Sequence, residues 1–141
     1  MQTASLWPAQ STRPLATVLA HTDAAGGQLA ALLADLGFRA TVRTKETVGH
    51  LDERPHLLCA DLRYVPSSWS HFAVDYLEML GDDIPTVAVL LKPDAEIVSA
   101  AWRMGIRLIR APISTGNVRR AIVDALRAPA KLVRPAAGPK A

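Results

Sequence analysis

The stretch that decides the fold is His56-Leu57-Leu58-Cys59-Ala60-Asp61-Leu62-Arg63, in which an apolar run ends in a carboxylate. A short, continuous apolar run favours a parallel strand that is covered on both faces. Open α/β sheets place their ligands and their chemistry at the carboxyl ends of such strands. Asp61 is therefore the first candidate for a functional residue.

Segments on both sides of this stretch alternate between strand and helix character. We expect the strands at 15–21, 38–43, 56–60, 86–91 and 106–110. We expect helices at 24–36, 45–52, 67–80, 93–104 and 115–127, of which the second is short and weak. Asp23, Ser67 or Ser68, and Ser114 are the expected N-caps, and Pro93 suits the first turn of its helix. The pattern predicts an α/β fold: a flavodoxin-like, doubly wound, five-stranded parallel sheet with strand order 2-1-3-4-5.

Length and composition predict one domain with flanking segments. The 141 residues are 50% hydrophobic and 21% charged, which is typical of a globular chain. We expect an N-terminal extension at 1–14, the folded domain at 15–127, and a flexible basic tail rich in proline and alanine at 128–141. No apolar run is long enough to span a membrane, and the N-terminus lacks a secretory signal. The single cysteine, Cys59, fits a reducing, cytoplasmic location.

The formal net charge of +3 is concentrated near the C-terminus. A basic cluster can indicate nucleic-acid binding. A solvated helix face followed by a basic tail explains the same residues, and we favour it, so nucleic acid is not the expected partner of this chain. The residues concerned are Arg119, Arg120, Arg127, Lys131, Arg134 and Lys140.

Several short segments occur in a characteristic order and spacing along residues 15–127: Leu33-Ala34-Asp35-Leu36-Gly37-Phe38, Asp61-Leu62-Arg63, Ile84-Pro85, Met104-Gly105 and Ala111-Pro112-Ile113-Ser114. With these segments, residues 15–127 resemble a response-regulator receiver domain. The resemblance implies that Asp61 stands where receivers accept a phosphoryl group. It also implies a cis peptide bond before Pro112.

The groups that usually serve this aspartate are replaced in the present chain. The resemblance puts Ala20 and His21 where receivers hold Mg²⁺ with two acidic residues, Leu90 where they have Thr or Ser, and Ala111 where they have Lys. Phosphoryl transfer depends on metal ions and fixed cations that neutralise the phosphoryl oxygens. The chain is thus similar to a degenerate receiver, or pseudo-receiver, and we expect no enzymatic activity, no catalytic residue and no cofactor. Asp61 could equally be a strand-end residue that caps the following turn.

Two other patterns carry little chemistry. His21, His50, His56, His71 and Cys59 show no ligand-pair spacing, so no metal site is expected. Gly26-Gly27 could open a phosphate-binding turn, but the fingerprint G-x-G-x-x-G is absent. Close packing of the backbone is the favoured explanation for these glycines.

A surface near the C-terminus is the expected site of partner binding. Helical spacing turns Ile97, Ala101 and Met104 towards the sheet and leaves Val98 and Trp102 on an adjacent, more exposed stripe. In receivers, the face formed by this helix, the fifth strand and the last helix binds partners. The resemblance adds Leu108 to the apolar centre, with Arg119 and Arg120 as a charged rim. Trp102 could instead cover the edge of the core.

The sequence thus leaves three functions open. The favoured one is a signalling or regulatory module that binds a protein partner, or a second copy of itself, without phosphorylation. The second is a phosphate-accepting receiver that uses Asp61. The third is the input domain of a transcription or antitermination regulator. None of them requires a membrane.

Overall fold

A computed structural model describes residues 13–47, 53–66, 69–80, 84–92 and 94–127. Five parallel strands form one sheet in the order β2-β1-β3-β4-β5. The strands are β1 (Leu15–Ala20), β2 (Arg39–Arg43), β3 (Leu57–Asp61), β4 (Thr86–Leu90) and β5 (Arg107–Arg110). The helices are α1 (Gly27–Asp35), α2 (Trp69–Leu80), α3 (Ala95–Met104) and α4 (Thr115–Arg127). This architecture confirms the predicted doubly wound fold and its strand order.

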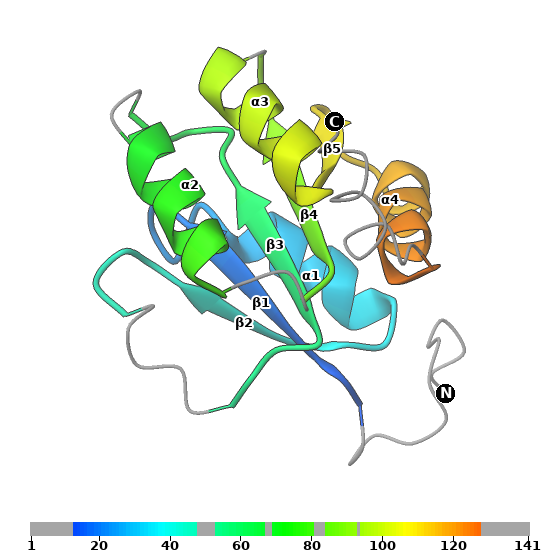
Figure 1. The fold of residues 1–141 in the computed structure, drawn as a ribbon. Coiled ribbons are helices and arrows are strands. Elements are labelled where there is room, and N and C mark those ends of the chain that lie inside the picture. Colours follow the sequence, from blue (N-terminus) through cyan, green and yellow to red (C-terminus); the bar gives the residue numbers. More distant parts are fainter. Residues whose placement is uncertain (1–12, 48–52, 67–68, 81–83, 93, 128–141) are drawn as a thin grey trace.

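Helices cover both faces of the sheet, as Figure 1 shows. One core cluster joins α2 and α3 to Leu19, Leu58, Ala60 and Ala88 of the strands. The other joins α1 and α4 to alternating neighbours in the same strands, among them Val18, Cys59, Val87 and Val89. Successive side chains of a strand point to opposite faces, so the apolar runs of β1, β3 and β4 supply both clusters. Every residue of these three strands is buried.

Helix α1 begins later than predicted, and Asp23 is not its N-cap. The hydroxyl of Thr22 accepts a hydrogen bond from the Ala25 amide at 3.0 Å, which closes a turn before the helix. The N-cap position belongs to Gly26. A Cβ atom on this residue would lie 2.9 Å from Cγ1 of Val42 and 3.0 Å from Cβ of Ala20. Close packing of the Gly26 backbone on the sheet thus decides where α1 starts.

The predicted helix at 45–52 is wrong over its described part. Residues 45–47 form a turn, in which the Thr47 hydroxyl accepts a hydrogen bond from the Thr44 amide at 2.9 Å. Local side-chain bonds of this kind compete with helix formation. Residues 48–52 of that prediction lie outside the described residues, as do the proposed caps Ser67 and Ser68 and the helix-starting Pro93.

The later element boundaries follow the sequence closely. Asp94 is the N-cap of α3, with its carboxylate 3.0 Å from the Ile97 amide. Ser114 caps α4 as predicted, because its hydroxyl accepts from the Asn117 amide at 3.1 Å. The Ala111–Pro112 peptide bond is cis, which confirms that prediction. Within the described residues, no helix combines the length and the apolar character needed to cross a bilayer.

Candidate functional site

The sheet brings Asp61 and the four predicted pocket residues to one edge. Ala20 is the register partner of Asp61 across β1 and β3, and Asp61 is the partner of Val89 across β3 and β4. Leu90 follows at the end of β4, and its carbonyl accepts a hydrogen bond from the Ala111 amide at 2.8 Å. His21 comes directly after β1 and is exposed. The carboxyl edge of the sheet is therefore where the candidate pocket lies.

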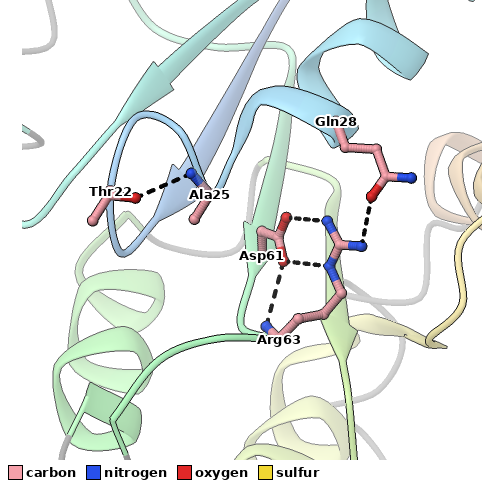
Figure 2. A network of polar contacts seen from close by, with 5 residues as sticks. All are labelled: Thr22, Ala25, Gln28, Asp61 and Arg63. Atoms are coloured by element: carbon pink, nitrogen blue, oxygen red, sulfur yellow. Dashed lines mark hydrogen bonds and ion pairs between the residues drawn. The ribbon is translucent and has the colours of Figure 1, made fainter.

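Asp61 is buried at this edge and is held by a single cation. Its carboxylate accepts two parallel hydrogen bonds from the Arg63 guanidinium, Nε to Oδ1 at 2.9 Å and Nη2 to Oδ2 at 2.8 Å (Figure 2). The side chains are 2% and 5% exposed, respectively. Bidentate pairs of this geometry are among the strongest ion pairs in proteins. Both oxygens of the candidate phosphoacceptor are thus engaged within the chain.

A side chain from α1 completes this network. The third nitrogen of the guanidinium, Nη1, donates to Oε1 of Gln28 at 2.9 Å. Figure 2 shows Gln28 reaching from the start of α1 towards the Asp61–Arg63 pair. The network consequently joins the end of β3 to the first turn of α1.

The Asp61 carboxylate affects the pKa values of two neighbouring side chains, Arg63 and Cys59. The hydrogen bond to Asp61 raises the pKa of Arg63, while burial acts in the opposite direction. Burial also raises the pKa of the Cys59 thiol to about 12, and the nearby charge of Asp61 adds to this effect. The guanidinium therefore stays charged, and the thiol stays neutral at ordinary pH.

The residues present do not fit a magnesium site of the receiver type. Mg²⁺ requires hard oxygen ligands in near-octahedral geometry. The Asp61 carboxylate is held by Arg63, Ala20 offers no ligand atom, and His21 offers only an imidazole whose ring contacts Trp69 edge-on at 6.0 Å between centroids. In the described part of the chain, no group of three or more His, Cys, Asp or Glu side chains is placed to hold a metal ion.

The predicted partner-binding residues divide into two groups. Trp102, Leu108 and Arg120 line one groove of about 760 Å³ between α3, β5 and α4. Trp102 is 79% exposed, so it does not cover the core, and Leu108 is 39% exposed. Val98 is half-buried against the α2–α3 core cluster, and Arg119 is exposed on α4 but does not line the groove. We call the groove-bearing surface the α3–β5–α4 face.

Arg63 and Gln28 were not recognised as site residues in the sequence. Alternation along an extended chain could have suggested Arg63, because residues two apart point to the same side. Nothing local points to Gln28, since it lies 35 positions from Arg63 and meets it only through the packing of α1.

Sequence comparison gives no family for this chain: no protein-family model matches it, and no curated protein matches it either. Comparison with solved structures is informative. The class that the fold defines is the receiver-type, CheY-like α/β fold.

Three solved structures illustrate the similarity. The signal receiver domain of a modulated diguanylate cyclase from Desulfovibrio desulfuricans matches with a TM-score of 0.64 and 18% identity, over 86% of this chain and 98% of that one. A response regulator receiver protein from Burkholderia phymatum matches with a TM-score of 0.63 and 20% identity, over 82% and 96%. One from Pseudomonas putida matches with a TM-score of 0.62 and 18% identity, over 80% and 98%. At these identities, the similarity establishes the fold.

Proposed function

We propose that this chain is a pseudo-receiver, a signalling or regulatory module that binds a protein partner without being phosphorylated. The observation that carries the proposal is the bidentate ion pair between buried Asp61 and Arg63. An incoming phosphoryl group needs a free carboxylate oxygen, together with a metal ion and fixed cations for its own oxygens. Here the cation neutralises the aspartate itself, and Ala20, Leu90 and Ala111 provide no replacement for the missing groups.

The replaced pocket residues support the same conclusion. Receiver domains have, by the resemblance, a hydroxyl and a lysine near the phosphoacceptor. In this chain those positions hold Leu90, which is buried, and Ala111, which precedes the cis peptide bond. Neither side chain can donate a hydrogen bond to a phosphoryl oxygen. A conformational change triggered by phosphorylation would therefore lack a side chain at these positions that could bind the phosphoryl group.

Treatment with acetyl phosphate and Mg²⁺, followed by intact-mass measurement, tests this part of the proposal. We expect no phosphoryl adduct in the wild-type chain. Stoichiometric labelling that disappears in Asp61→Asn, but persists in the exposed control Asp75→Asn, would overturn the proposal in favour of a phosphate-accepting receiver.

The α3–β5–α4 face is the surface that we propose for partner binding. It presents an exposed tryptophan at the rim of a groove, and tryptophan is enriched among the residues that dominate binding energy. Affinity capture from native cells should therefore depend on Trp102. Met79 on α2 is 72% exposed and lies outside the groove, so Met79→Ala is a matched control. A set of captured proteins that is the same for wild type and Trp102→Ala would exclude this face.

A further inference from the structure

The open edge of the sheet lies inside the groove of the α3–β5–α4 face. Strand β5 ends the strand order, and among the described residues it pairs only with β4. The amide of Ala111 donates to the carbonyl of Leu90 at 2.8 Å. Because successive residues of a strand direct their backbone groups to opposite sides, the amides and carbonyls of Leu108 and Arg110 point away from β4. No residue in the described ranges pairs with these groups, so a further strand can bond to them.

The groove has the shape and apolar content for an extended segment. Its wall includes every residue from 106 to 110, flanked by Ala101 and Trp102 of α3 and by Arg120 and Ala121 of α4. Figure 1 shows β5 between these two helices at the side of the sheet. Trp102 and Leu108 offer exposed apolar surface on the side of α3. An added strand would thus meet backbone groups along its length and an apolar surface for its side chains.

The groove is lined mainly by positive charge, which favours an acidic ligand. Arg107, Arg110 and Arg120 line it, against the single carboxylate of Asp124. The Nε atom of Arg107 is buried and has no hydrogen-bond partner in the described part of the chain. Pairing β5 with a second copy of itself would bring arginines close to one another, which is unfavourable.

The chain's own C-terminal segment is an equally poor match. Residues 128–141 contain Lys131, Arg134 and Lys140 and no acidic residue, so their charge has the same sign as that of the groove. A partner segment that mixes acidic and apolar residues suits both the arginines and the Trp102–Leu108 surface.

We propose that an extended, acidic and apolar segment of a partner protein adds to the free edge of β5 as a sixth strand and fills this groove. The inference rests on the proposed function and specifies how its partner binds. Strand addition obtains affinity from backbone hydrogen bonds and specificity from alternate side chains. The carboxylates of the segment pair with Arg107 and Arg120 on the side of α4, and its apolar side chains pack on Trp102 and Leu108 on the side of α3.

Amide hydrogen exchange of the ¹⁵N-labelled full chain tests the binding mode. The probe is a ten-residue peptide that alternates glutamate with valine, and the control peptide has lysine in place of glutamate. At saturation, we expect exchange of the Leu108 and Arg110 amides to slow by about tenfold or more, because both gain acceptors. The Ala111 amide, already bonded to Leu90, should change little, and the lysine peptide should have no effect.

Charge reversal supplies the second test. Arg107→Glu and Arg120→Glu should each weaken binding of the glutamate peptide by about tenfold, because each change replaces an attractive charge opposite the glutamates by a repulsive one. Arg127→Glu makes the same change of charge on the exposed surface of α4, outside the groove, and should bind the peptide within about twofold of wild type because only long-range charge is altered.

Each remaining outcome would overturn the inference. No binding of the glutamate peptide, or binding without protection at Leu108 and Arg110, would exclude strand addition. If capture from cells still depended on Trp102, the proposed function would stand while this binding mode failed. If the Leu108 and Arg110 amides were already protected from exchange without any peptide, the groove would be occupied by a second copy of the chain or by residues 128–141.

Discussion

The guanidinium of Arg63 donates a hydrogen bond to each oxygen of the Asp61 carboxylate at the end of β3, and both side chains are at least 95% buried. Replacing Arg63 by Leu would leave a buried carboxylate without its cation. Loss of one partner of a buried pair typically costs about 3–5 kcal/mol. We expect Arg63→Leu to lower the free energy of unfolding by about 3 kcal/mol, measured by urea denaturation.

An exposed ion pair in the same molecule is the control. Arg39 and Glu53 lie 2.7 Å apart, but their side chains are 44% and 49% exposed. Solvent screens such pairs, so Arg39→Ala should change stability little. The double variant Asp61→Leu/Arg63→Leu removes both charges and should be more stable than the sum of the single losses predicts. Equal losses for Arg63→Leu and Arg39→Ala would show that the buried pair has no special role.

The two adjacent glycines at the start of α1 should respond in opposite directions to alanine. A Cβ on Gly26 would meet Val42 at 2.9 Å and Ala20 at 3.0 Å, whereas a Cβ on Gly27 would meet nothing within 4 Å. Overpacking of this kind costs about 1–3 kcal/mol, so Gly26→Ala should lower the melting temperature. Gly27→Ala should leave it unchanged or raise it, because alanine favours the helix by up to about 1 kcal/mol. Equal effects in thermal melts would contradict the close packing of α1 on the sheet.

Much of this fold could be predicted because its decisive patterns are local. The apolar run that ends in Asp61 identifies β3, and the hydroxyl of Ser114 identifies the start of α4. The start of α1 was misplaced because Asp23 is a competent cap by residue type, whereas a turn closed by Thr22 and the packing of Gly26 against Val42 of another strand make Gly26 the N-cap. Local propensity cannot resolve a choice that tertiary contact makes.

The same distinction applies to the candidate site. The resemblance to receiver domains placed Ala20, Leu90 and Ala111 beside Asp61, and the parallel sheet does bring the ends of their strands to a common edge. The Arg63–Gln28 hydrogen bond could not be predicted, since it requires the position of α1 over that edge. The resemblance indicated the face between α3, β5 and α4, but its groove depends on how the C-terminal end of α3 and the middle of α4 pack on opposite faces of the sheet beside the edge strand.

Cys59 should be unreactive in the folded chain. Its side chain is fully buried, and burial raises its pKa from 9.0 to about 12. Between these two values the unfolded chain ionises its thiol and the folded chain does not. The stability contributed by this group is therefore present below pH 9 and is lost as the pH rises towards 12. A colorimetric thiol reagent at about pH 8 should react only after urea is added. Stoichiometric reaction without denaturant would show that β3 opens readily.

Trp102 and Trp69 should separate binding from folding. Trp102 is 79% exposed on α3, whereas Trp69 is 5% exposed and contacts the Phe72 ring at 5.1 Å between centroids. Trp69→Ala should lower the free energy of unfolding by about 3–5 kcal/mol, as expected for a buried tryptophan. Trp102→Ala should leave the thermal melt nearly unchanged, yet weaken association with a partner by about 2 kcal/mol or more if its ring is a binding hot spot. Sedimentation or titration with a captured partner measures the second effect. If Trp102→Ala unfolds the domain while association survives, the α3–β5–α4 face is not the binding surface, and Trp102 belongs to the core.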